Sequence, residues 1–347
     1  MTEIPGVEQR RETGFRPAPR HDRRADYQPP PAVAAIDLGT NNCRLLVARP
    51  APGGFRVIDA FSRIVRLGEG VGRTGLLCDG AVDRTIAALR VCAGKMARRR
   101  VALNRAVATE ACRRAGNFLQ FQERVRDETG VTLEMISAEE EARLALAGCA
   151  PLLDPRVSHA LVFDIGGGST ELMWLAVSCG GRPSRLIESV SLPLGVVTLS
   201  ERHGGDAVSA EAYEAMVADA LERMAPLEAR RGIAARVARG EVQMLGSSGT
   251  VTTLAGVFRK LPRYDRSVVD GTFLDFSAAR SVSDELRAMD YEGRAAHPCI
   301  GRDRADLVVA GCAILEAICR LWPVGRLRIA DRGVREGILL DLIARLP

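Results

Sequence analysis

The sequence DIGGGSTELMW, from Asp164 to Trp174, repeats the pattern of an earlier stretch, DLGTNNCRLLV, from Asp37 to Val47. In both, an aspartate closes a hydrophobic run, an aliphatic residue and a glycine follow, and a new hydrophobic run begins after a few polar residues. One such Asp-x-Gly is weak evidence, because Asp and Gly are common in turns. Two copies between hydrophobic strands favour a duplicated unit, and two unrelated hairpin turns are the alternative.

Similar elements surround each copy. Around the first, β-rich runs predict an antiparallel meander, and apolar residues at helical spacing predict a helix over 79–98. The strands predicted in this half cover 33–36, 43–48, 55–61, 106–109 and 131–136, with further helices at 118–128 and after Ser137. Strands followed by alternating helices indicate an α/β unit. Around the second copy, the prediction is strands at 161–165, 170–176, 185–191, 242–245 and 327–330, and helices at 210–230, 250–257, 305–322 and 334–345.

Composition limits the class of protein. Of 347 residues, 47% are hydrophobic, and a formal charge of +5 is too small to indicate nucleic-acid binding. The nine cysteines show no zinc-site spacing and no apolar run is long enough to cross a bilayer, which favours a reduced, cytoplasmic protein. Residues 1–31 hold six arginines, five acids and six prolines, so a disordered tail is expected there, with an arginine arm that touches a polyanion as the alternative.

The two repeated turns suit phosphate binding. Without bulky side chains, successive backbone N–H groups point into one concavity and phosphate oxygens approach closely. Two such turns on facing domains would hold a phosphate chain from both sides, and Asp37 and Asp164 at the strand ends are placed to hold a hydrated Mg²⁺. The candidate phosphate-binding residues in these turns are Gly39, Thr40, Asn41, Asn42, Gly166, Gly167, Gly168 and Ser169.

Further segments make the chain similar to a known family. From about Ala32 to the C-terminus it resembles the short, two-domain form of the exopolyphosphatase and guanosine pentaphosphate phosphohydrolase (Ppx/GppA) family, within the superfamily of actin, sugar kinases and heat-shock ATPases. The resemblance implies an α/β fold of two ribonuclease H-like (actin-like) domains, 32–150 and 151–347, with an interdomain cleft. Besides the two repeated stretches it rests on RLGEG at 66–70, ATEACRRAGN at 108–117, ISAEEEARLALAG at 136–148, SLPLGVVTLSER at 191–202, GSSGTVTTL at 246–254, RADLVVAGCAIL at 304–315 and DRGVREG at 331–337.

The resemblance also assigns roles to single residues. The family's proposed catalytic base is the Glu directly before Ala-Arg, here Glu141, and a carboxylate that activates an in-line water suits phosphoanhydride hydrolysis. From the residues alone, the run from Glu139 to Glu141 is equally well an acidic first helical turn. Glu171 matches a position that organises metal and water together with Asp164, and a strand-edge acid facing solvent is its alternative. Arg113 matches the family's arginine that touches substrate phosphate.

A third loop and the last motif complete the candidate site. The loop lies between a strand and a helix, where helix N-terminal amides receive an anion; a plain turn with Thr250 as the helix N-cap is its alternative. Arg335 and Glu336 are interpreted as an interdomain ion pair rather than as substrate contacts. The residues of the loop predicted to bind phosphate are Gly246, Ser247, Ser248, Gly249 and Thr250.

The predicted function is exopolyphosphatase: Mg²⁺-assisted attack of water releases terminal orthophosphate from inorganic polyphosphate. The resemblance leaves room for Mn²⁺ and for a monovalent cation. Guanosine pentaphosphate is the alternative substrate, with binding of the alarmone ppGpp and a role in the stringent response. A small-molecule kinase of the same superfamily and a non-catalytic, nucleotide-sensing or filament-forming regulator rank lower. No nucleic-acid or membrane partner is expected, and a homodimer is expected on base rates.

Overall fold

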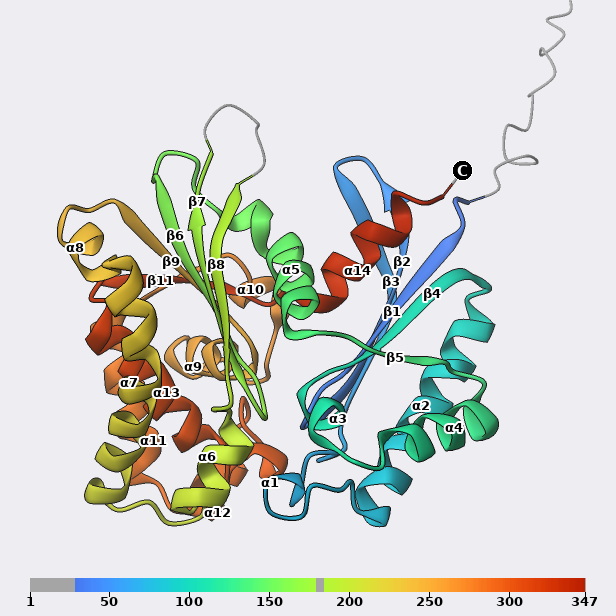
Figure 1. Cartoon of the computed structure of the whole chain (residues 1–347), viewed down its shortest axis with the longest axis horizontal. Helices are drawn as coiled ribbons and strands as arrows, with labels where there is room; N and C mark the ends of the chain where they lie inside the picture. Colours follow the sequence, from blue (N-terminus) through green and yellow to red (C-terminus); the bar gives the residue numbers. More distant parts are fainter. Residues whose placement is uncertain (1–28, 179–183, 347) are drawn as a thin grey trace, which may run out of the picture. The chain divides into compact units, whose positions relative to one another are not determined.

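The computed structural model describes residues 29–178 and 184–346. The chain divides into a short N-terminal unit, Met1–Pro30, and a unit from Pro31 to Pro347 that contains every described helix and strand. The predicted disordered tail therefore lies almost wholly outside the described residues. Within the larger unit, two mixed β-sheets carry the helices (Figure 1).

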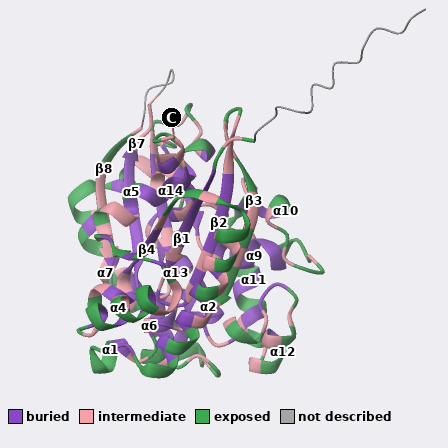
Figure 2. Cartoon of the chain, turned by 90° about the vertical axis from the view of Figure 1, so that its right-hand side faces the viewer, coloured by how far each residue is buried: buried purple, intermediate pink, exposed green. Residues whose placement is uncertain are grey.

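The first sheet has the strand order β3-β2-β1-β4-β5. Strands β1, β2 and β3 form the predicted antiparallel meander, while β4 and β5 run parallel to β1. Alternate residues of β1 and β2 belong to two different core clusters, so both faces of the sheet are covered, and Figure 2 shows these strands as buried. The bounds are β1 Ala32–Leu38, β2 Asn42–Ala51, β3 Gly54–Ile64, β4 Val101–Ala108 and β5 Leu133–Met135.

The second sheet repeats the first. Its strands β8, β7, β6, β9 and β11 follow one another in the order and directions of β3, β2, β1, β4 and β5, and the short β10 adds an antiparallel edge. This duplication confirms the predicted fold of two actin-like halves and makes the alternative of unrelated hairpin turns wrong. The bounds are β6 His159–Ile165, β7 Thr170–Ala176, β8 Arg185–Leu192, β9 Val242–Ser247, β10 Phe273–Asp275 and β11 Arg326–Ala330.

The long helices follow the predicted periodicity closely. Helix α2 occupies the predicted residues, Asp79–Arg98, and α5, Ala138–Cys149, begins after Ser137, whose hydroxyl accepts a hydrogen bond from the backbone N–H of Glu140. The remaining helices of the first half are α1 Val71–Thr74, α3 Glu110–Arg114 and α4 Phe118–Thr129. Those of the second are α6 Val196–His203, α7 Ala210–Arg231, α8 Ile233–Ala238, α9 Gly249–Phe258, α10 Arg266–Val269, α11 Phe276–Ala288, α12 Tyr291–Ala296, α13 Val308–Leu321 and α14 Val334–Ile343.

Helices α5 and α14 lie between the two sheets (Figure 1) and approach each other closely at two glycines. A Cβ placed on Gly337 would lie 2.1 Å from the carbonyl oxygen of Leu144, and one on Gly148 would lie 2.2 Å from that of Gly333. Only glycine permits this approach. Both helices share a hydrophobic cluster with strands of both sheets, and α14 packs on β1 although it follows the second sheet in the chain. The predicted division into 32–150 and 151–347 stays a prediction.

Candidate functional site

The two repeated turns converge. A Cβ on Gly167 would lie 3.0 Å from the Cβ of Thr40, and one on Gly168 would lie 2.6 Å from the Thr40 hydroxyl, so glycine is needed where the second turn meets the first. Between the turns lies a cavity of about 130 Å³. Its wall contains every predicted phosphate-binding residue of the two turns, the three predicted metal ligands and Glu141.

The two turns also have the same internal geometry. The N–H of Gly39 donates to the carbonyl of Asn42 and that of Gly166 to the carbonyl of Ser169, each at 2.9 Å. Across the hairpins, Asp37 pairs in register with Arg44, while Asp164 pairs with Glu171. The duplicated positions therefore carry opposite charges, a guanidinium in the first half and a carboxylate in the second. Arg44 lines the cavity and was missed by the sequence analysis, although its place in the repeat could have indicated it.

Several polar groups on the cavity wall lack a partner within the protein. Among the described residues, four buried side-chain polar atoms have no hydrogen bond, and three of them, Asn41 Oδ1, Asn42 Oδ1 and Ser248 Oγ, belong to residues that line this cavity. Asn41 is only 6% exposed. Because buried polar groups are normally hydrogen-bonded, these atoms indicate a site that a polar ligand completes.

The carboxylates at the cavity are buried and raise one another's pKa values. Burial raises the pKa of Asp37 and of Asp164 above the usual range, against the opposing charge of Arg44. Burial and the nearby Asp164 raise the pKa of Glu171 to about 7, although the hydroxyls of Ser169 and Ser191 donate to it at 2.7 and 2.8 Å. Glu171 is 3% exposed, so the alternative of a strand-edge acid facing solvent is wrong.

Glu141 faces the same group of acids from the first turn of α5. Burial and the nearby Glu171 raise its pKa well above the usual range, whereas the guanidinium of Arg113, which donates to Glu141 Oε2 at 2.8 Å, lowers it. Of the other two acids in the run, Glu139 is exposed and Glu140 forms ion pairs with Arg105 and Arg143. The sequence thus places three acids in one turn, and the fold directs one of them to the cavity.

The third predicted loop contributes in part. Ser248, Gly249 and Thr250 line the cavity, and Ser247 donates to Asp164 Oδ2 at 3.0 Å. Gly246 does not line the cavity. A Cβ at this position would lie 2.6 Å from the ring of Phe163, so the glycine is needed for packing. Helix α9 begins at Gly249 with Ser248 at the N-cap, which corrects the predicted Thr250 cap.

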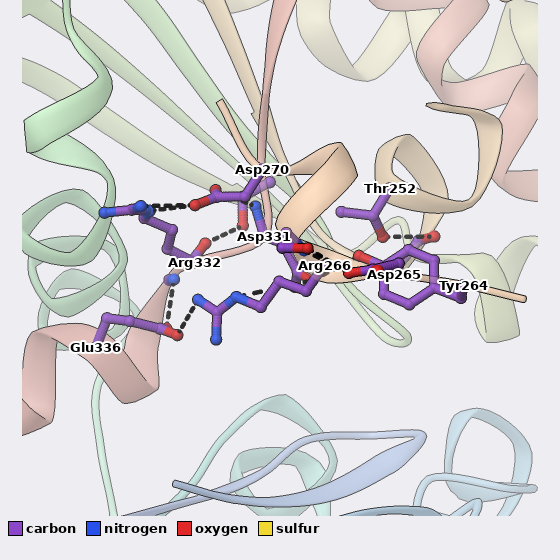
Figure 3. A network of polar contacts seen from close by, with 12 residues as sticks. Thr252, Tyr264, Asp265, Arg266, Asp270, Asp331, Arg332 and Glu336 are labelled. Atoms are coloured by element: carbon purple, nitrogen blue, oxygen red, sulfur yellow. Dashed lines mark hydrogen bonds and ion pairs between the residues drawn. The ribbon is translucent and has the colours of Figure 1, made fainter. Parts of the chain in front are cut away.

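A second cavity of about 380 Å³ adjoins the first, and the residues that line both include Asp37, Asp164, Arg44 and Arg304. Figure 3 shows part of its wall, where Arg266 pairs with Glu336 and Arg332 with Asp270. The predicted ion pair between Arg335 and Glu336 is therefore wrong, since the carboxylate of Glu336 is taken by Arg266 and by the N–H of Gly333.

Three further arginines on this wall, Arg44, Arg304 and Arg335, form no ion pair with any described residue. Burial lowers the pKa of Arg335 and of Arg304, and the neighbouring charge of Arg44 lowers both further. Placing three guanidinium groups together without ion pairs is unfavourable, and a bound anion would offset part of that cost. Arg304 lies within the motif at 304–315 and had no predicted role, whereas Arg335 was interpreted only as a member of an ion pair.

The described residues contain no group of three or more His, Cys, Asp or Glu side chains arranged to hold a metal ion. Asp37 and Asp164 nevertheless fit Mg²⁺ chemically, because Mg²⁺ takes one or two carboxylates together with waters and substrate phosphate oxygens. A divalent cation beside these two acids would also favour their ionised forms and so oppose the rise in their pKa values. In the described ranges no helix combines the length and the apolar character that a membrane span requires.

Comparison with known proteins shows which proteins this chain resembles. The chain is 30% identical over 330 residues to "Exopolyphosphatase 2" of Mycobacterium tuberculosis, covering 89% of this chain and 98% of that protein. A solved exopolyphosphatase-like protein superposes with a TM-score of 0.81 at 30% identity, covering 91% of this chain and 100% of the other. The Ppx/GppA family member of Aquifex aeolicus superposes with a TM-score of 0.74 at 29% identity, over 91% and 98%. With residues 46–346 matching the model of the Ppx/GppA phosphatase family, the chain belongs to that family.

Proposed function

We propose that this chain is an exopolyphosphatase, which hydrolyses the terminal phosphoanhydride bond of inorganic polyphosphate. One observation carries the proposal: two glycine-rich turns meet around one cavity that is lined both by residues with unpartnered polar atoms and by the largely buried Glu141. Polyphosphate as the substrate is further supported by the relatives named as exopolyphosphatases.

In the proposed reaction, the terminal phosphoryl group lies between the turns at Gly39–Asn42 and Gly166–Ser169. The backbone N–H groups of the turns stabilise the charge on the phosphoryl oxygens. The oxygen of a water attacks the terminal phosphorus, and the bond from that phosphorus to the bridging oxygen breaks. The bridging oxygen stays with the shortened chain, orthophosphate is released, and Glu141 accepts the proton of the water.

The environment of Glu141 suits a general base. Burial and the nearby Glu171 raise the pKa of Glu141, which makes its carboxylate a stronger proton acceptor, while Arg113 donates a hydrogen bond to it. The residues that would hold Mg²⁺, or Mn²⁺ in its place, are Asp37, Asp164 and Glu171. A bound divalent cation neutralises phosphoryl charge.

The arginine-lined second cavity supports polyphosphate over guanosine pentaphosphate. Arg44, Arg304 and Arg335 together offer positive charge to the phosphates that precede the terminal one, and guanidinium groups bind phosphate oxygens in bidentate fashion. The one aromatic side chain on that wall, Tyr264, is held by Asp331 (Figure 3). A purine would find little there to stack on, so guanosine pentaphosphate and ppGpp are the second candidate ligands.

The test is phosphate release from short polyphosphate, long polyphosphate and guanosine pentaphosphate, measured side by side with Mg²⁺. We expect release from polyphosphate, and a loss of about 10²- to 10⁴-fold in kcat for Glu141→Gln, the range for removal of a general base. Glu139→Gln is the matched control, since this residue is on the same helical turn but exposed. Release from guanosine pentaphosphate alone would support the alternative substrate, and full activity of Glu141→Gln would refute the assigned base.

A further inference from the structure

Arg113 uses its whole guanidinium group to join two carboxylates. Its Nε and Nη2 donate to Glu110 Oε2 at 3.2 and 3.0 Å, and its Nη1 donates to Glu141 Oε2 at 2.8 Å and to the carbonyl of Ile136 at 3.1 Å. All three side chains are largely buried, with 17% of Arg113, 16% of Glu110 and 14% of Glu141 exposed. The result is a chain of contacts from Glu110 through Arg113 to the proposed base.

The geometry places the two acids, but not the arginine, on the cavity wall. Glu110 and Glu141 line the cavity between the turns, whereas Arg113 is behind them and is not among its lining residues. Glu110 also touches the second turn, because a Cβ on Gly168 would lie 3.1 Å from Glu110 Cγ. Glu110 thus connects the turn that would hold the phosphoryl group with the arginine that holds the base.

Glu141 needs such a support, because the groups facing it are mostly negative. Glu171 from β7 and Asp37 from β1 both act against its ionised form, and Arg113 from α3 is the cation that opposes them. An arginine side chain is long and flexible, so its fork must itself be fixed before it can fix another group. The two hydrogen bonds to Glu110 provide that constraint.

We propose that Glu110 is a positioning residue: it holds the guanidinium of Arg113 against Glu141, so that Arg113 orients the base and does not serve as a phosphate ligand. This inference rests on the proposed function of Glu141. It departs from the role that the family resemblance gives to Arg113, and it assigns a role to Glu110, which lies within the motif at 108–117 but had no predicted role.

The test is a double-mutant cycle on polyphosphate hydrolysis with Glu110→Ala, Arg113→Ala and both together. A loss of orientation at the base is expected to lower kcat by about 10- to 100-fold, as for other displacements near 1 Å, with KM changed less than about threefold. Because Glu110 acts through Arg113, the double variant should be no slower than Arg113→Ala alone. Glu110→Gln keeps an oxygen that accepts from Arg113, so it should recover part of the activity.

Two outcomes would overturn the proposal. If Arg113→Ala raises KM more than tenfold with kcat unchanged, Arg113 is a phosphate ligand; if the two single effects multiply in the double variant, Glu110 does not act through Arg113. Asp284→Ala is the matched control, because it removes an acid from a pair of the same spacing, Asp284 with Arg287, on α11. Denaturant unfolding of each variant identifies a loss caused by misfolding. Failure of the base assignment itself would appear separately, as activity retained by Glu141→Gln.

Discussion

The crossing of α5 and α14 predicts opposite effects for two glycine-to-alanine substitutions. In Gly337→Ala the new Cβ would lie 2.1 Å from the Leu144 carbonyl oxygen, so the helices must separate by about 0.9 Å to reach 3.0 Å, below which such contacts essentially do not occur. Overpacking of this kind costs about 1–3 kcal/mol. Gly94, in the exposed part of α2, has no atom within 4 Å of a built Cβ, so Gly94→Ala should stabilise by roughly 0.5–1 kcal/mol.

The assay is urea unfolding followed by circular dichroism, with phosphate release measured on the same samples. We expect the two variants to differ by about 2–4 kcal/mol in the free energy of unfolding. Leu144 is one turn after Glu141 on α5, so Gly337→Ala should also lower kcat, by up to about 100-fold for a displacement near 1 Å. Equal stability of both variants would refute the tight crossing. A destabilised Gly337→Ala with unchanged kcat would refute only the coupling to Glu141.

Two further predictions concern the buried acids. Burial raises the pKa of Glu171 from 4.5 to about 7, so between these pH values the folded protein keeps a proton that the unfolded chain releases. The free energy of unfolding, measured in EDTA, should therefore fall by about 3 kcal/mol as the pH rises from 4.5 to 7. Glu171→Gln should lose this part of the pH dependence. Identical slopes in urea titrations from pH 4.5 to 8 would contradict the pKa assignment. Mg²⁺ should raise the thermal unfolding midpoint of the wild type at pH 8. Asp37→Asn or Asp164→Asn should remove most of this rise, because each variant loses a carboxylate ligand. An equal rise in the variants would exclude these carboxylates as ligands.

Much of the fold could be predicted from the sequence because its main elements have strong local signals. The strands of the hairpins around both turns either alternate hydrophobic with polar residues or end close to a glycine. Helices α2 and α7 show clear helical periodicity of their apolar residues. Residues 259–304 yielded no prediction, and they contain α10, β10, α11 and α12. Three of these elements are six residues or shorter, so their stability comes from packing rather than from a periodic pattern.

The candidate site was predicted where chemistry is local to one loop, and missed where it depends on distant contacts. The glycines of both turns and the strand-end acids could be read directly, because a turn motif carries its own geometry. Arg44 could have been found from its place in the repeat, opposite Asp37 as Glu171 is opposite Asp164. For Arg304 and Arg335, no sequence feature separates the arginine from a surface charge, because their common cavity forms only in the folded chain. The position of Arg113 behind Glu141 likewise depends on how α3 meets α5.

Ser248 has a backbone φ of 105°, a value that side-chain-bearing residues seldom adopt, and its hydroxyl has no partner. Such a residue costs of order 1–3 kcal/mol, and Asn41, which lines the same cavity, has an unpartnered Oδ1 atom. Strained backbone and unpartnered polar atoms are thus concentrated at this cavity. A ligand that supplies the missing hydrogen bonds would offset part of this cost. A ligand that binds more tightly at this cavity should therefore also stabilise the protein more strongly against unfolding.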